Sequence, residues 1–370
     1  MNFNFYHRFN EIPKGDWEIL SKNDKLFLSK SFLQIFENQI DNDLSAIYVI
    51  AKVESRVVGI VYAQIFKLNS KKIQEYIRSS NPTITLLGSI KLVLAKFLSL
   101  RVCFLGNLFM SNESTYYFVE ELSPIHFTEL INQISDFSNS KFVMIPEFFN
   151  DLIPKKNTNF LPLYVEPDMH MHIPESWIHF DDYVISIQSK YKKKLRKVLL
   201  NSNPLDIREL HIDDLNIYAS QINTLFNNVF YKSSFNTSKF DTNFFPYLKQ
   251  NGLNINIQGY FIENKLLGFS SSIIHENQLY VYFMGLDYTL NKVYDIYSRM
   301  LYDKIKYAIN QRLSVIKFGR TASEFKSNFG AKPMGNRAFI YSKSNLFFRI
   351  LGPFTRLIKP KIWKQRNPYK

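Results

Sequence analysis

The feature that most constrains the fold of this chain is a short sequence that occurs twice. Glu54–Ile60 reads ESRVVGI, and Glu263–Phe269 reads ENKLLGF, a match residue class by residue class. In each copy apolar-rich runs flank a two-residue polar turn, which is typical of a β-hairpin. Gly59 and Gly268 occupy the same place in the second strand, where they predict a bulge or a close backbone approach. We therefore expect two related halves.

The segments around each hairpin also correspond. The first half predicts a helix over Ser31–Ile40, a third strand over Leu100–Phe109, a helix over Pro124–Phe137 capped by Ser123, and a strand over Phe142–Ile145. The second half predicts helices over Leu215–Phe230 and Thr242–Lys249, then a strand over Leu279–Gly285, a helix over Val293–Asn310 and a strand over Val315–Phe318. The expected fold class is α/β of the α+β type, with two tandem domains, each a central mixed β-sheet flanked by helices.

The length of 370 residues suits two domains, and the hydrophobic content of 46% supplies two cores. We place an N-terminal domain at 1–178, a basic linker helix at 179–203, a C-terminal domain at 204–345 and a basic tail at 346–370. The linker helix begins at Ser189. Its apolar stripe consists of Tyr191, Leu195, Val198 and Leu199, and cations fill the remaining surface.

The net charge of +14 is concentrated in two places. Residues 325–370 contain lysine and arginine but no acidic residue, and Lys190–Lys197 form a second basic cluster. Such clusters indicate an anionic partner: the phosphates of a nucleotide, a tRNA, a lipid headgroup or a cell-wall precursor. A solvated basic surface is the alternative.

The sequence also bears on location. The N-terminus has no basic segment followed by an apolar one, so no secretory signal is expected. The most apolar stretch, Ile84–Leu100, is interrupted by Lys91 and Lys96 and predicts an amphipathic or buried helix rather than a membrane span. We expect a cytoplasmic protein. The aromatic and cationic tail, Leu346–Lys359, would either rest on an anionic membrane surface or pack onto the second domain.

Three motifs carry a resemblance to known proteins: Ser189–Lys192 (SKYK), Gly319–Lys326 (GRTASEFK) and Phe325–Gly330 (FKSNFG). In this order they resemble the tandem-GNAT families, which include BioF-type and CelD-like acetyltransferases and the Fem-type aminoacyl ligases of cell-wall bridge synthesis. The resemblance covers 180–341 best. It implies a cytoplasmic N-acyltransferase that transfers an acyl or aminoacyl group to an amine of a polar, cell-envelope-related substrate, without metal or redox cofactor.

The sequence identifies the acyl donor less directly. Acetyl-CoA-binding GNAT domains have a glycine-rich turn after the third sheet strand, where backbone N–H groups bind the pyrophosphate. Here Leu286–Lys292 contains no glycine, and Asp287 would repel a phosphate. The corresponding turn in the first half, Asn107–Glu113, has no glycine either. Acyl-CoA therefore remains one candidate, and a larger acyl or aminoacyl donor held by basic side chains is the other.

Candidate site residues lie mainly around the second and third motifs. The predicted substrate-binding residues are Arg320, Lys326, Lys190 and Lys192, and the catalytic candidates are Glu324, Asp287 and Tyr282. Amine acylation needs a proton acceptor and donors for the developing oxyanion. Each catalytic candidate also has a structural interpretation. Glu324 suits an i, i+4 ion pair with Arg320, Asp287 suits a helix N-cap, and Tyr282 suits the core.

Other chemistries find little support. His170, His172 and His179 have no Cys or carboxylate cluster beside them, and Asp168 alone is weak support, so no metal site is predicted. Cys103 is the only cysteine and lies in an apolar run. Walker, Gly-x-Gly-x-x-Gly, Gly-x-Ser-x-Gly and Cys-x-x-Cys motifs are absent from the sequence. A non-catalytic protein that binds an anionic lipid, a polymer or a tRNA remains the alternative function, and the oligomeric state is left open.

Overall fold

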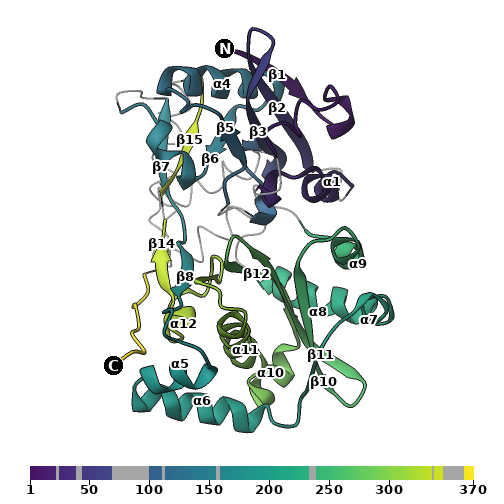
Figure 1. The fold of residues 1–370 in the computed structure, drawn as a ribbon, viewed down its shortest axis with the longest axis vertical. Helices are drawn as coiled ribbons and strands as arrows, with labels where there is room; N and C mark the ends of the chain where they lie inside the picture. Colours follow the sequence, from purple (N-terminus) through teal and green to yellow (C-terminus); the bar gives the residue numbers. More distant parts are fainter. Residues whose placement is uncertain are drawn as a thin grey trace, which may run out of the picture. The chain divides into compact units, whose positions relative to one another are not determined.

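The chain forms two compact units in the computed structural model (Figure 1). The structure describes residues 1–21, 25–38, 44–68, 100–110, 113–155, 159–232, 239–335, 337–344 and 362–370. The first unit comprises Met1–Val165, Ser234–Phe240 and Asn336–Lys361; the second comprises Glu166–Ser233, Asp241–Gly335 and Ile362–Lys370. Two segments discussed above, most of the apolar stretch over 84–100 and the tail over 346–359, lie outside the described residues.

The first unit is built on a mixed sheet with strand order β1-β2-β3-β4-β6-β15-β7, in which β5 also pairs with β3. Helix α4 packs on one face, where Phe127, Leu130 and Ile134 join the core. Its strands and helices are β1 (Asn2–Tyr6), α1 (Lys30–Asn38), β2 (Leu44–Val53), β3 (Arg56–Leu68), β4 (Leu100–Phe104), β5 (Tyr116–Phe118), α4 (Pro124–Phe137), β6 (Phe142–Ile145), β7 (Phe160–Tyr164) and β15 (Arg337–Tyr341).

The second unit has a sheet of order β14-β8-β13-β12-β11-β10-β9. Its strands are β8 (Asp168–His172), β9 (Asp206–Glu209), β10 (Ile255–Ile262), β11 (Lys265–His275), β12 (Gln278–Leu286), β13 (Val315–Lys317) and β14 (Lys332–Met334). Its helices are α5 (Phe180–Ser186), α6 (Ser189–Asn201), α7 (Ile212–Ile217), α8 (Ala219–Lys232), α9 (Phe245–Gln250), α10 (Tyr288–Tyr294), α11 (Ile296–Asn310) and α12 (Ser323–Ser327). Helices α5, α6 and α11 share a core with β8, β12 and β13.

The two sheets follow the same plan. In each, four antiparallel strands are followed by a parallel neighbour, β6 beside β4 and β13 beside β12. Both hairpins begin their turn with a glutamate at positive φ, Glu54 and Glu263. A Cβ on Gly59 would lie 2.2 Å from the Phe118 ring, and one on Gly268 would lie 2.7 Å from Met300 Cε. The register of each hairpin also shifts beside its glycine, between Ala51 and Lys52 in the first and between Tyr260 and Phe261 in the second, so the expected bulge is present in both. The fold class with two mixed sheets is confirmed.

Each sheet also receives one strand from outside the sequence range first assigned to it. Strand β8 lies within the predicted range 1–178 but pairs with β13 and β14 of the second unit. Strand β15 lies within 204–345 but pairs with β6 and β7 of the first. The compact units and the sequence ranges differ here because strand pairing joins residues far apart in the chain, which local periodicity does not reveal.

Local predictions agree with the structure more closely. Helix α4 and strand β6 have the predicted bounds, and the Ser123 side chain accepts a hydrogen bond from the His126 N–H as an N-cap. Helix α6 begins at Ser189 as expected. Leu199, assigned to its apolar stripe, is 40% exposed, so that part of the prediction is wrong.

The predicted third strand of the first half is shorter than expected: β4 ends at Phe104, and a 3-10 turn over Leu108–Met110 follows. The predicted helix over Val293–Asn310 is instead divided into α10 and α11. Asp295 interrupts it in a left-handed conformation, and its carboxylate accepts a hydrogen bond of 2.8 Å from Asn201 Nδ2. In the described part of the chain, no helix is long and apolar enough to cross a bilayer.

A buried lysine lies inside the second unit. Lys304 of α11 is fully buried, and its Nζ donates to Ser272 Oγ at 3.0 Å and to Asn256 Oδ1 at 3.4 Å. Burial lowers the pKa of Lys304 to about 7, although the carboxylates of Asp303 and Glu209 oppose the shift. The folded chain therefore carries a lysine that loses its proton far below the ordinary pKa of about 10.4.

This lysine makes the stability of the protein depend on pH. Between about pH 7 and the ordinary lysine pKa, the unfolded chain binds a proton that the folded chain lacks, so the free energy of unfolding rises with pH by up to about 1.4 kcal/mol per unit. We expect Lys304→Met to reduce this rise, as measured by urea unfolding across the window. Lys306→Met, which removes an exposed lysine from the same helix, is the control. Identical slopes in the wild type and Lys304→Met would contradict the assignment.

Candidate functional site

Strands β12 and β13 diverge after the third of the nine residues of β12. They pair in parallel only from Gln278 and Val315 to Tyr280 and Lys317, after which β12 continues to Leu286 while β13 ends. The chain after β13 turns through residues 318–322 into the short helix α12. Sites in α/β proteins gather at the carboxyl ends of strands where neighbouring connections diverge. This divergence is the first candidate site.

The turn after β13 is an unusual piece of backbone. Gly319 has φ 78°, and the two non-glycine residues Thr321 and Ala322 have φ 68° and 51°. Lys326 stabilises this turn from α12, because its Nζ donates to the carbonyl oxygens of Gly319 at 2.9 Å and Arg320 at 2.7 Å. Left-handed non-glycine residues are costly and concentrate at functional sites. The turn is therefore held in shape by a buried cation.

Lys326 itself is buried, with 5% of its surface exposed. Burial lowers the pKa of its ammonium to about 8, and the nearby carboxylates of Asp168 and Glu166 oppose that shift. Arg320 lies in the turn, where Nη1 donates to the Glu166 carbonyl oxygen at 2.5 Å. The i, i+4 ion pair expected between Arg320 and Glu324 does not form, because α12 begins only at Ser323.

A histidine–aspartate pair lies on the adjacent strand. His170 Nε2 is 2.5 Å from Asp168 Oδ2, and the Met169 N–H donates to Asp168 Oδ1 at 3.0 Å. The Asp168 side chain is buried, and the His170 side chain is 16% exposed. His170 on β8 is directly opposite Lys317, the last residue of β13, so the histidine–aspartate pair lies next to the turn that follows β13. In the sequence, His170 and Asp168 were considered only as metal ligands, and their pairing was not predicted.

The candidates on β12 have other partners. The Asp287 carboxylate accepts hydrogen bonds from the N–H groups of Thr289 at 2.8 Å and Leu290 at 3.1 Å, so it caps α10. Tyr282 follows the point of divergence, and its ring centre is 4.1 Å from that of Phe283. Burial raises the pKa of Tyr282 well above its ordinary value.

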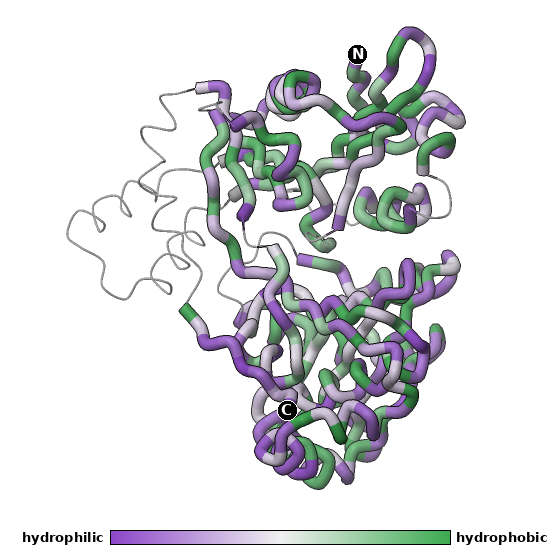
Figure 2. Tube along the Cα trace, turned by 60° about the vertical axis from the view of Figure 1, so that its left-hand side comes forward, coloured by the Kyte–Doolittle hydropathy of each residue, from purple (hydrophilic) through white to green (hydrophobic). Residues whose placement is uncertain are grey.

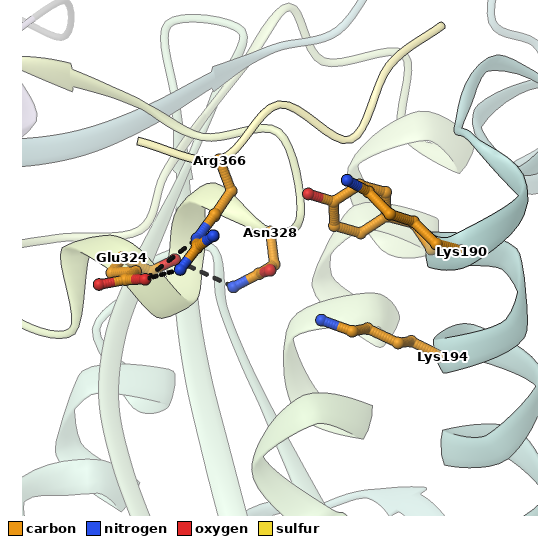
Figure 3. A pocket seen from close by; sticks show the side chains of 6 residues that line it. Lys190, Lys194, Glu324, Asn328 and Arg366 are labelled. Atoms are coloured by element: carbon orange, nitrogen blue, oxygen red, sulfur yellow. Dashed lines mark hydrogen bonds and ion pairs between the residues drawn. The ribbon is translucent and has the colours of Figure 1, made fainter. Parts of the chain in front are cut away.

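A second group of candidates lines a cleft of about 330 Å³ on the other side of α12 (Figure 3). The lining residues are Lys190, Tyr191, Lys194, Glu324, Asn328 and Arg366. Arg366 Nε donates to Glu324 Oε1 at 3.0 Å, and the Lys364 N–H donates to Oε2 at 3.4 Å. These two donors hold the pKa of Glu324 below its ordinary value, with Arg366 the larger cause. Glu324 is therefore an ion-paired carboxylate.

The structure thus separates the predicted site residues into three places. Lys190 and Glu324 share the cleft, whereas Lys192 is half-buried and does not line it. Arg320 and Lys326 lie at the turn after β13, and Asp287 and Tyr282 lie on or just after β12. Lys194, Asn328 and Arg366 are additions; the spacing of Lys194 one helical turn after Lys190 was the available signal. Among the described residues, no three His, Cys, Asp or Glu side chains gather to hold a metal ion.

Comparison with known proteins identifies solved structures with a similar fold. No family model matches the chain, and no curated protein does. The chain is similar to the solved structure of FemX, with 11% identity, a TM-score of 0.51, and coverage of 94% of this chain and 99% of FemX. It is also similar to a conserved protein of unknown function from Bacteroides thetaiotaomicron, with 10% identity, a TM-score of 0.49, and coverage of 91% of this chain and 99% of that one. A third similar structure is L-PGS from Bacillus licheniformis, with 10% identity, a TM-score of 0.49, and coverage of 94% of this chain and 96% of that one. The similarity to FemX confirms the resemblance to Fem-type proteins at the level of the fold.

The role of Lys326 can be tested by proteolysis. Lys326→Met removes two hydrogen bonds from a charged donor, each worth about 1.5–3 kcal/mol. We expect the turn to open more often, because a loss of about 1.4 kcal/mol of stabilisation raises the population of the open turn about tenfold. Trypsin should then cleave the native protein after Arg320 at least about tenfold faster, as quantified by mass spectrometry. The exposed-lysine variant Lys332→Met should retain the wild-type rate; an equal acceleration in both would contradict this role.

Proposed function

We propose that the chain transfers an aminoacyl or acyl group to an amine at the turn after β13 in the second unit. The observation that carries the proposal is the left-handed turn braced by Lys326, which presents Arg320 beside the diverging strands. The sequence motifs in this segment resemble Fem-type aminoacyl ligases, and the fold agrees with that of FemX. Fold alone does not define activity, so the proposal depends on the residues of the turn.

The donor that this site favours is large and anionic. In this proposal the Arg320 guanidinium, whose Nη1 donates to the Glu166 carbonyl oxygen, would also donate to a phosphate oxygen of the donor. The conventional CoA mode needs free N–H groups at the start of the helix after the third strand. In this chain the Asp287 carboxylate already accepts hydrogen bonds from two of these N–H groups, those of Thr289 and Leu290. We therefore favour an aminoacyl-tRNA over acyl-CoA as the donor.

The proton acceptor in the proposal is His170. An attacking amine forms the new C–N bond, the ester C–O bond of the donor breaks, and the amine proton must move to a base. His170 would take this proton and return it to the leaving hydroxyl, while Asp168 orients the ring and stabilises the imidazolium. The acceptor amine belongs to a polar, cell-envelope-related molecule, as the sequence resemblance implies.

A second candidate function is that of a non-catalytic binding protein. It is favoured by the engagement of two catalytic candidates in structural roles: Glu324 is paired with Arg366, and Asp287 caps α10. Catalysis in the first proposal then depends on His170, so a test of this residue distinguishes the transferase from the binding protein.

The test combines donor binding with transfer. We expect native mass spectrometry to show no stoichiometric acetyl-CoA complex, and filter binding to retain aminoacyl-tRNA more tightly than deacylated tRNA. Arg320→Gln should weaken retention by about tenfold, equivalent to about 1.4 kcal/mol, whereas Lys306→Gln, an exposed control, should not. His170→Gln should keep binding but lose transfer of the labelled amino acid to lysine as a model amine.

Two results would overturn this function. Stoichiometric acetyl-CoA binding together with equal retention of both tRNA forms would indicate a conventional CoA-dependent enzyme. Retention of aminoacyl-tRNA without transfer by the wild type would favour the binding role instead.

A further inference from the structure

The cleft beside α6 is separate from the turn after β13. Glu324 and Asn328 are four residues apart and line the cleft, whereas Lys326, between them, is buried against the turn. Residues two apart on a helix point in nearly opposite directions. Helix α12 therefore has the turn on one face and the cleft on the other.

The opposite wall of the cleft is basic. Lys190 and Lys194 are one turn apart on α6, and Figure 3 shows both ammonium groups directed from α6 toward the side that carries Asn328 and Arg366. Their Nζ atoms lie 5.0 Å and 5.5 Å from the Tyr191 ring centre, over its face. In the described part of the chain neither lysine forms an ion pair with a carboxylate. The single carboxylate in the lining, Glu324, is already neutralised by Arg366.

This arrangement opposes the electrostatic preferences of a helix. Helix α6 carries Lys190 and Lys192 in its first turn, has no acidic residue there, and its N-cap residue Gln188 makes no side-chain cap. Cations are unfavourable at a helix N-terminus. Lys190 and Lys194 also repel each other, because residues at i and i+4 are neighbours on the helix surface. A bound anion would relieve both effects.

The C-terminal segment completes the cleft. Gln188 Nε2 donates to the Tyr369 carbonyl oxygen at 2.5 Å, and the Gln188 N–H donates to the Pro368 carbonyl oxygen at 2.8 Å. These bonds fix the segment that carries Arg366 at the start of α6. Figure 2 shows that the segment leading to the C-terminus is largely hydrophilic. The segment that contributes Arg366 to the cleft is therefore held in place by hydrogen bonds to the start of α6.

We propose that this cleft binds a phosphate group of a small phosphate ester. The ammonium groups of Lys190 and Lys194 supply the charge and the donors that a phosphate needs. Arg366 is already paired with Glu324, and the Asn328 amide donates to backbone carbonyl oxygens, so these two residues shape the cleft and leave its net charge to the lysines. The volume of about 330 Å³ falls at the lower end of ordinary ligand pockets, enough for a phosphate with a short attached group. The proposal does not depend on the transferase function.

The experiment compares two double variants of the full chain by isothermal titration calorimetry with pyrophosphate and glycerol phosphate. Lys190→Gln/Lys194→Gln removes the cleft lysines, and Lys193→Gln/Lys197→Gln removes the same charge, at the same spacing, from exposed positions of α6 that do not line the cleft. We expect about a tenfold loss of affinity or more in the first variant, and a change within about twofold in the second. Thermal unfolding of both variants checks that they are folded.

Sedimentation with vesicles distinguishes the source of the phosphate. Binding to phosphatidylglycerol but not phosphatidylcholine vesicles, lost only in Lys190→Gln/Lys194→Gln, would support the site with a lipid headgroup as its ligand. Binding of pyrophosphate or glycerol phosphate without vesicle binding, with the same dependence on the variant, would support a small-molecule ligand. Equal losses of anion affinity in both double variants, or tRNA retention that falls equally in both, would assign the binding to a diffuse basic surface and overturn the proposed site. The absence of any anion binding by the wild type would overturn it too.

Discussion

The insertion of β8 between β13 and β14 is the constraint on which the second unit depends. It places His170 opposite Lys317 on one side and Lys332 on the other, and it buries Asp168 within reach of the Lys326 charge. Without this strand β13 would be an edge, and the turn after it would have no carboxylate or imidazole beside it. Strand β15 has the same position in the sheet of the first unit, between β6 and β7. Strand pairing therefore supports both sheets and assembles the candidate site.

Buried lysines give the second unit a distinctive electrostatic interior. Burial of an ammonium without a close carboxylate is costly, and it lowers the pKa of the group. Lys304 and Lys326 both show this shift, and both are surrounded by neutral acceptors: side-chain oxygens for Lys304 and backbone carbonyls for Lys326. Lys326 stabilises a turn whose backbone is strained, so the cost of its burial is linked to the geometry of the proposed site.

Helix α12 organises the basic residues into two separate environments. On one face, Lys326 is withdrawn from solvent and acts on the backbone of the turn. On the other, Glu324 and Asn328 share a cleft with the lysines of α6 and with Arg366. The positive charges of the second unit therefore have different roles. Arg366 forms an ion pair, Lys326 stabilises the turn, and Lys190 and Lys194 line the cleft.

Local physics made much of this fold predictable from the sequence by itself. Apolar spacing, a serine cap and two-residue polar turns determined α4, β6, the start of α6 and both hairpins, because these features depend on residues a few positions apart. Only the tertiary structure decided that β8 and β15 lie in different sheets from the strands that precede them in the chain, β7 and β14. It also decided that Glu324 pairs with Arg366 rather than Arg320, and that Asp168 and His170 form a pair beside the turn. Those outcomes depend on competition among strand edges and charges distant in the chain, which is resolved only when the backbone hydrogen bonds of each sheet are satisfied.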